Sequence, residues 1–223
     1  MAMLLALVFS SASCVLLSAA GQASAGAGAR IAPNREIILT AEERALVLKG
    51  KVVLRELPPL GPKGRTYEAV GVIPGSLDEA ASVLTDFGRY AEFMPSVSGV
   101  NVRERDGPHS VVEMTLHLPL GTKRQYRLRY TAVRYEAGFE LGWEKLDWPG
   151  LKPSQTIADT TGFWNVRPFE AGGLLVVYRV YTDPGYIPLG LTGIARKMAK
   201  HKIPDGIVEL RERVRKLSRP GVN

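Results

Sequence analysis

Residues 110–134 read SVVEMTLHLPLGTKRQYRLRYTAVR, and apolar and polar side chains alternate on both sides of a central Pro/Gly segment. Val112, Met114 and Leu116 share one parity before that segment, and Tyr126 and Tyr130 share one parity after it. A period of two with one apolar face is typical of antiparallel strands that are covered on one side. The stretch therefore predicts two such strands, residues 110–118 and 122–134.

The chain on either side of this stretch predicts more strands. They are expected at residues 51–57, 65–73, 97–105, 139–144, 156–169 and 173–182, with Pro- or Gly-containing turns between several of them. A sheet with this many strands has to twist and curl, because each strand has an intrinsic right-handed twist. The sequence therefore predicts a curved antiparallel sheet.

Two helices are marked by capping boxes, in which a Ser or Thr is followed three residues later by Glu. Thr40 and Glu43 begin a short helix at residues 40–49, and Ser76 and Glu79 begin a second one whose apolar stripe runs to Phe87. A short helix over residues 89–94 follows.

The C-terminal region predicts a long helix that is broken just before Pro204. Its apolar stripe repeats every three or four residues and finds cover on the concave face of the sheet. A curved sheet closed by a helix encloses a space, so we expect a ligand cavity of roughly 300–1,000 Å³ there.

Residues 1–25 carry no charge and end in Ala23-Ser24-Ala25, the small residues that a signal peptidase requires. The expected division is a signal peptide over 1–25, a linker and short helix over 26–50, and a ligand-binding domain over 51–219. This predicts a periplasmic or secreted protein. An uncleaved membrane anchor and a lipidated Cys14 are the alternatives. Cys14 is the only cysteine, so a mature chain that starts at Gly26 has no disulfide, thiolate nucleophile or cysteine metal ligand.

The positive charge is concentrated at the C-terminus. Residues 190–223 hold nine Lys/Arg and three acidic residues, which accounts for six of the seven net positive charges. This pattern suits an anionic membrane surface or an acidic protein, and it also fits an ordinary solvated helix face. Because the leader argues against nucleic acid, we expect no nucleic-acid partner.

Three short motifs, in this order and spacing, resemble the START-like (SRPBCC) superfamily of StAR-related lipid transfer, coenzyme Q-binding and polyketide cyclase proteins. They are LTDF with YAEFMP (84–87 and 90–95), GFW followed by Pro168 (162–168), and DPGYIP with IPD and LR (183–188, 203–205 and 210–211). The resemblance implies an α+β helix-grip fold, in which a curved antiparallel sheet wraps around a long C-terminal helix. Members carry sterols, phospholipids, quinones or polyketides in the enclosed cavity, and a minority are enzymes.

The expected ligand-binding residues are those whose parity or helical position directs them to the concave side. Arg124 shares the parity of Tyr126 and is expected at the cavity rim, where it could meet a ligand head group. The full set is Phe93, Met94, Met114, Leu116, Arg124, Tyr126, Tyr130, Trp143, Trp164, Ile194 and Met198. For each apolar member, ordinary core packing is the competing interpretation.

The sequence offers no catalytic set. Its three histidines are expected to be exposed, and no known nucleophile, phosphate-binding or metal-ligand motif occurs. The strand acids Glu113, Glu140 and Glu144 have outward parity and are expected to be solvated. We therefore expect a monomeric carrier that binds a lipid or another apolar molecule without a cofactor or metal. A polyketide cyclase or aromatase-like enzyme, and an interaction module whose cavity is only core, are the alternatives.

A closed cavity needs a movable edge. The Pro/Gly-rich segments 146–154 and 183–190 are the candidates. Trp148 is expected to be exposed beside this portal and to insert at a membrane interface. Arg196, Lys197 and Lys200 would attract anionic head groups there.

Overall fold

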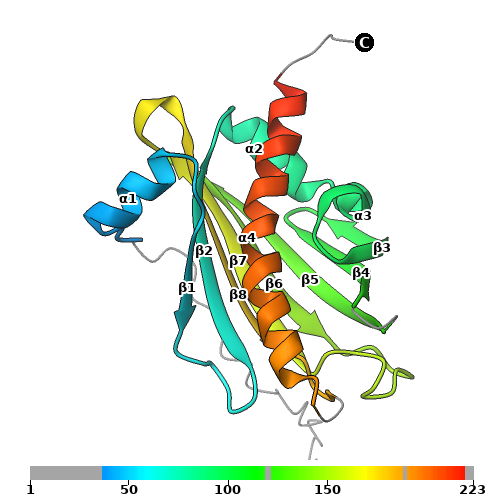
Figure 1. Cartoon of the computed structure of the whole chain (residues 1–223). Helices are drawn as coiled ribbons and strands as arrows, with labels where there is room; N and C mark the ends of the chain where they lie inside the picture. Colours follow the sequence, from blue (N-terminus) through cyan, green and yellow to red (C-terminus); the bar gives the residue numbers. More distant parts are fainter. Residues whose placement is uncertain (1–36, 119–121, 188–189, 219–223) are drawn as a thin grey trace, which may run out of the picture.

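The computed structural model describes residues 37–118, 122–187 and 190–218, and within them the strands form one antiparallel sheet. Its spatial order is β1-β2-β8-β7-β6-β5-β4-β3. The sheet curves around the C-terminal helix α4 (Figure 1), as predicted. The strands are β1 Val53–Leu57, β2 Arg65–Ile73, β3 Val97–Asp106, β4 His109–His117, β5 Lys123–Tyr135, β6 Gly138–Leu146, β7 Asp159–Pro168 and β8 Leu174–Asp183.

Both predicted capping boxes are confirmed. Thr40 caps α1 (Ala41–Leu48) together with Glu43, and Ser76 caps α2 (Leu77–Thr85) together with Glu79. Helix α2 ends two residues before Phe87, because Asp86 leaves the helical conformation at φ −83° and ψ 64°. A 3₁₀ turn, Phe87–Arg89, and α3, Tyr90–Phe93, then form a corner. A second 3₁₀ turn, Glu170–Gly172, joins β7 to β8.

The prediction of a break before Pro204 is wrong. Helix α4, Thr192–Leu217, runs through Pro204 without interruption. Ile203 packs against the core on one side of the proline, and Ile207 is fully buried on the other. Apolar contacts on both sides thus keep the helix continuous across a residue that cannot donate a backbone hydrogen bond.

The main core lies between the concave face and the helices. The inward stripe of α4 meets side chains from β2, α2 and β7, and its central members are fully buried. These residues include Ala69, Ile73, Leu84, Trp164, Val166, Ile207, Leu210 and Val214.

A smaller apolar cluster lies on the convex face, where Ile37 covers Val70, Phe163 and Val177. Arg167 donates to the carbonyl oxygen of Ile37 at 3.3 Å. The sheet is therefore covered on both faces around β2, β8 and β7, which the one-sided alternation of β4 and β5 did not indicate.

The prediction that the outward acids Glu113 and Glu140 are solvated is wrong, because both are buried. Glu113 accepts from Arg127 at 2.7 Å, and Glu140 accepts from Asn165 at 3.1 Å. Long polar side chains of neighbouring strands lie over these carboxylates, and charge-assisted hydrogen bonds offset the cost of their burial. Glu144 stays partly exposed beside Arg129, as predicted.

The predicted signal peptide, including its cleavage site, lies outside the described residues. No helix in the described part of the chain has both the length and the apolar character needed to cross a membrane.

Candidate ligand-binding site

The inward faces of β4, β5 and β6 form the floor of the candidate site. Met114 lies directly opposite Tyr126, and Tyr130 lies directly opposite Trp143. All four side chains are buried in the main core. Because paired residues on adjacent strands project side by side on one face, these four form a continuous patch.

Aromatic rings extend this patch toward α4. The centroids of Trp143 and Tyr178 are 5.8 Å apart, and Tyr178 stacks on Trp164 at 3.9 Å with an interplanar angle of 5°. Gly206 of α4 sits against this stack, since a Cβ added there would lie 3.3 Å from the Trp164 ring. The helix is thus seated on the Trp164–Tyr178 pair.

Aromatic rings also extend the patch in the other direction, toward the corner between α2 and α3. The Tyr130 ring lies 4.5 Å from Phe87, Phe87 lies 5.4 Å from Tyr90, and Tyr90 lies 5.5 Å from Phe93, between centroids. With Trp143, Tyr178 and Trp164, these rings form an unbroken aromatic path across the concave side. Below, we call these seven residues the aromatic path.

The phenols of this interior are neutral. Burial raises the pKa of Tyr90, Tyr126, Tyr130 and Tyr178 above the ordinary value, because a phenolate would lose its hydration. They stay protonated at neutral pH and can donate hydrogen bonds. Tyr90 already does so, to the carbonyl oxygen of Leu84.

Arg124 lies near the start of β5 with the parity of Tyr126, on the concave side. It is 8% exposed, and its guanidinium donates to the carbonyl oxygens of Lys123 and Tyr186 at 3.3 and 3.2 Å. No carboxylate among the described residues forms a salt bridge with it. A buried guanidinium with neutral partners retains its capacity to bind an anionic group.

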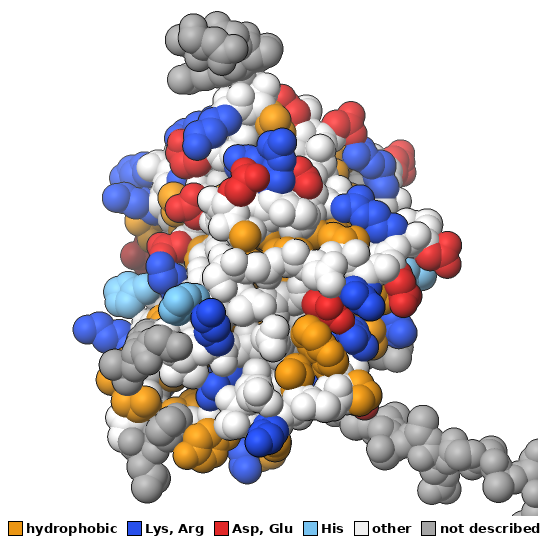
Figure 2. Space-filling view, turned by 90° about the vertical axis from the view of Figure 1, so that its right-hand side faces the viewer, with side chains coloured by type: hydrophobic (Ala, Val, Ile, Leu, Met, Phe, Trp, Pro, Cys, Tyr) orange, Lys and Arg blue, Asp and Glu red, His pale blue; other side chains and the backbone are white. Residues whose placement is uncertain are grey.

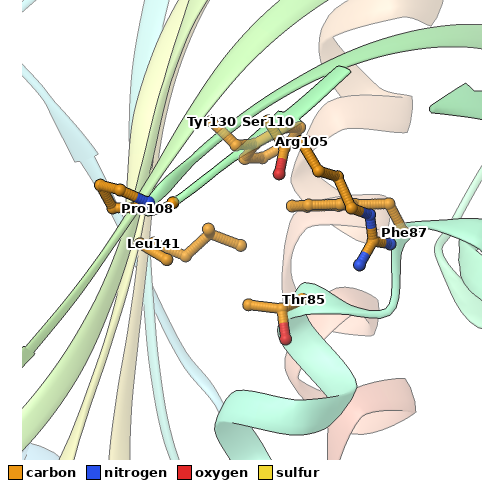
Figure 3. Close-up of a pocket in the computed structure, with 9 residues that line it drawn as sticks. Thr85, Phe87, Arg105, Pro108, Ser110, Tyr130 and Leu141 are labelled. Carbon is orange, nitrogen blue, oxygen red and sulfur yellow. The ribbon is translucent and has the colours of Figure 1, made fainter. Parts of the chain in front are cut away.

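One hollow on the concave side is small. It measures about 130 Å³, and Phe87 and Arg105 face Tyr130 and Leu141 across it (Figure 3). This is below the expected 300–1,000 Å³, because the rings of the aromatic path occupy much of the space under α4. Its lining is Thr85, Phe87, Arg105, Gly107, Pro108, Ser110, Tyr130, Ala132 and Leu141.

A larger hollow of about 340 Å³ lies on the other face of the sheet. It is lined by Thr115, Lys123, Gln125 and Gln155, and it is open to solvent. Thr115 and Gln125 have the parity opposite to Met114 and Tyr126, so this hollow lies on the convex face of the sheet, and its lining is polar. It therefore does not correspond to the expected apolar cavity.

A family model described as polyketide cyclase / dehydrase and lipid transport matches residues 65–215. The chain belongs to this family. The match covers β2 to most of α4 and includes the whole aromatic path. It confirms the resemblance on which the expected fold rests.

Solved structures agree with this family's fold. A STAR-related lipid transfer protein fragment from Xanthomonas axonopodis has a TM-score of 0.64 at 18% identity, over 74% of this chain and 93% of that one. The Zhui aromatase/cyclase from Streptomyces sp. R1128 has a TM-score of 0.59 at 15% identity, over 71% and 99%. Human StAR-related lipid transfer protein 5 has a TM-score of 0.58 at 14% identity, over 74% and 88%. At these identities the likeness shows the fold alone. A comparison with curated protein sequences found no significant match.

Most predicted site residues of this family member lie together on the concave side. Five belong to the buried core, and three more are half-buried against it. The buried set is Met114, Tyr126, Tyr130, Trp143 and Trp164, and the half-buried set is Phe93, Met94 and Leu116.

Ile194 and Met198 do not join this group. Ile194 is 52% exposed, and Met198 is half-buried outside the concave cluster. The reason is helical phase. Because α4 is continuous, the inward positions follow from Ile207 and fall on Ile203 and Ala199, which both pack against the core. In a helix broken before Pro204, residues 192–203 could have rotated independently, so that Ile194 and Met198 faced the sheet as the prediction assumed.

The prediction missed Tyr178, Phe87 and Tyr90 as site residues. Tyr178 shares the parity of Val176 and Val180 in β8, so the strand alternation could have identified it. Phe87 belonged to the predicted α2 stripe, but its place beneath Tyr130 depends on the corner at Asp86. The pattern of a single helix does not contain that corner.

The histidines do not contribute to this site. His109, His117 and His201 are exposed, as predicted. Within residues 37–118, 122–187 and 190–218, no group of His, Cys, Asp or Glu side chains is arranged to hold a metal ion.

Proposed function

We propose that this family member binds a lipid or another apolar molecule on the concave side of its sheet and transports or sequesters it outside the cytoplasm. The observation that supports this most is the aromatic path, an apolar interior at whose rim stands the buried guanidinium of Arg124. Such an arrangement suits an amphiphile whose apolar body is inside and whose polar group lies at the rim. The lipid transport named in the family description supports the same ligand class.

We expect α4 to move when a ligand enters beneath it, because the Trp164 and Tyr178 rings lie directly against the helix at Gly206. Residues 192–203 of α4 are mostly exposed, whereas the part after Pro204 contributes the fully buried Ile207, Leu210 and Val214. The exposed part is held to β1 by Glu56, which pairs with Arg196 and Lys200 at 3.1 Å each. Ion pairs between exposed side chains are weak, so this half of the helix can separate at low cost.

A carrier explains the interior better than an acid–base enzyme does. The buried carboxylates Glu68, Glu113 and Glu140 lie on the convex side of the sheet, and the buried phenols are protonated at neutral pH. Acid–base catalysis needs a proton acceptor within hydrogen-bond reach of the substrate. A cyclase or aromatase-like activity is the second candidate, because the fold resembles that of an aromatase/cyclase.

Native mass spectrometry of the protein purified from the exported fraction of its own host tests this proposal. We expect a non-covalent adduct with an apolar small molecule, and a protein mass that corresponds to a chain starting at Gly26. The adduct should pass unchanged to acceptor vesicles.

The outcomes separate the alternatives. A ligand released with an altered mass would favour the enzyme. A protein that carries no ligand and takes up none from vesicles would contradict the carrier. An intact leader, or an acyl group on Cys14, would contradict cleavage after Ala25.

A further inference from the structure

Tyrosine hydroxyls of the concave interior lack a strong hydrogen-bond acceptor, and that of Tyr67 is buried with no partner among the described residues. The hydroxyls of Tyr126 and Tyr130 reach only the thioether sulfur of Met114, at 3.7 and 3.9 Å. Among the described residues, none accepts from the hydroxyl of Tyr178. A thioether is a weak acceptor. Since buried donors are normally paired, under-used donors in one interior require an explanation.

The side chains of Tyr126, Tyr130 and Tyr178 belong to one cluster. Tyr126 and Tyr130 approach the same sulfur atom from two positions on β5, and Tyr178 joins them through Trp143, whose ring centroid is 6.1 Å from Tyr130 and 5.8 Å from Tyr178. Electrostatic interaction with Tyr90, Tyr126 and Tyr178 contributes to the raised pKa of Tyr130, after the larger effect of burial. The phenols therefore lie within electrostatic range of one another.

Tyr178 also borders open space. Its hydroxyl is not among the buried polar atoms without a partner, although it has no acceptor among the described residues, and the residue is only half-buried. The oxygen therefore keeps accessible surface while its ring stacks on Trp164 and packs at a tilt of 41° against Trp143. A donor in that position can be reached by a molecule that enters the concave side.

We propose that the hydroxyls of Tyr126, Tyr130 and Tyr178 recognise a neutral oxygen acceptor, such as a ketone or ether oxygen, on the buried end of an otherwise apolar, ring-containing ligand. This inference rests on the proposed function and specifies the class of ligand. The aromatic path supplies flat faces on which a rigid ring system can stack. The hydroxyl cluster adds polarity at one point of that surface.

The chemistry favours a neutral acceptor over an anion at this point. An anion buried among these phenols would lose its hydration, which is costly, and the Arg105 guanidinium lies across the hollow from Tyr130, over the Phe87 ring. Arg124, on this face of β5, lies two residues nearer the rim than Tyr126, or about 7 Å along the strand. An acidic group of the ligand would bind there, so the two ends of the site select different chemistry.

Fluorenone and fluorene test this inference as a matched pair, because they share one ring system and differ by a carbonyl group in place of a methylene. Their affinities are measured by equilibrium dialysis against the wild-type protein and the triple variant Tyr126→Phe/Tyr130→Phe/Tyr178→Phe. We expect the wild type to prefer fluorenone by about tenfold, the effect of roughly one or two neutral hydrogen bonds. The triple variant should bind both compounds equally and keep the wild-type affinity for fluorene.

Tyr181→Phe is the matched control. Tyr181 is a buried tyrosine on the convex face of β8, so its loss should leave the tenfold preference intact. If the triple variant does not fold, the single variant Tyr178→Phe is used, and a loss of about threefold in the preference is expected.

Each outcome has a distinct meaning. Equal binding of the two compounds by the wild type would overturn the inference and leave the carrier proposal in place, since the hydroxyls would then be satisfied by water. A preference that survives in the Phe variants would also overturn it. If neither compound binds, the proposal of an apolar binding site fails, and the inference fails with it.

Discussion

Gly162 shows how a single residue shapes the interior. It lies in β7 directly opposite Trp143 of β6. A Cβ at this position would overlap the Trp143 ring and the carbonyl oxygen of Arg179. The absence of a side chain thus allows the indole to lie across β7 and reach Tyr178.

We expect Gly162→Ala to lower the free energy of unfolding by about 2–3 kcal/mol, as over-packing of a filled core does. Because the ring must move, its contact with Tyr178 should be lost, and near-UV circular dichroism should report the change. Gly142→Ala is the control. The nearest atom to its added Cβ would be the carbonyl oxygen of Gly162 at 3.8 Å, an ordinary contact. Equal stability of the two variants would show that Gly162 does not have this role.

At the scale of elements, α4 combines two halves with different anchorage. The half after Pro204 is fixed by buried Ile207, Leu210 and Val214, and by Arg211, which donates to the carbonyl oxygens of Val72 and Gly50 at 3.0 Å each. The half before Pro204 depends on Ile203, Ala199 and the ion pairs with Glu56. Pro204 lies at the boundary between the two halves.

Pro204→Ala should restore the missing backbone hydrogen bond and stabilise the protein. We expect a gain of about 2 kcal/mol in the free energy of unfolding, less than the full cost of a helix proline because the unfolded chain also becomes more flexible. Amide hydrogen exchange in residues 192–203 should slow, and ligand uptake should slow with it. Val208→Ala, at an exposed position of the same helix, should change neither rate. Unchanged exchange in Pro204→Ala would show that Pro204 does not help residues 192–203 to separate from the sheet.

The sequence could predict the elements better than it could predict the site. Alternation in 110–134 and the capping boxes at Thr40 and Ser76 are local signals, and the structure confirms them. The phase of α4 and the position of Phe87 are set by contacts between elements, so a local pattern could not place Ile194 or Phe87 correctly. The burial of Glu113 and Glu140 escaped prediction for the same reason, since it depends on side chains from adjacent strands.

At the scale of the whole molecule, one end combines exposed apolar and basic side chains. Figure 2 shows hydrophobic side chains near Lys and Arg at the lower end, where α4 begins. Leu60, Tyr186 and Ile194 are exposed there by 37%, 59% and 52%. Trp148, expected to be exposed, is instead half-buried, with the guanidinium of Arg127 at 5.1 Å from its ring.

This surface predicts docking on anionic membranes through Tyr186, Ile194 and Lys197. Arg196 and Lys200 are partly neutralised by Glu56. Of these three neighbouring basic residues, Lys197 should therefore contribute most to membrane binding. We expect Lys197→Glu to weaken binding to phosphatidylserine vesicles at least fivefold at low salt, since one basic residue contributes about 1 kcal/mol near such a surface. Its effect should vanish at high salt, where the attraction is screened.

Tyr186→Ser/Ile194→Ser should weaken binding to the same vesicles at both salt concentrations, because burial of apolar side chains in the interface does not depend on ionic strength. Val133→Ser is the control. Val133 is an exposed apolar residue at the opposite end of β5 from Arg124, which contacts Tyr186, so this change should leave binding unchanged. Wild-type protein that does not bind vesicles at low salt would refute the docking prediction.

The pairing of β2 with β8 has a consequence for how the chain folds. Glu68 and Arg179, which hydrogen-bond across this pair at 2.7 Å, are 111 residues apart in the sequence. Closing so long a loop costs entropy before any contact compensates for it, and topologies of this kind fold slowly. The ribosome must release nearly the entire domain before β2 finds its partner. A nascent chain that stays unfolded for so long remains a suitable substrate for a translocation channel, so the strand order of this sheet is compatible with the export that we propose.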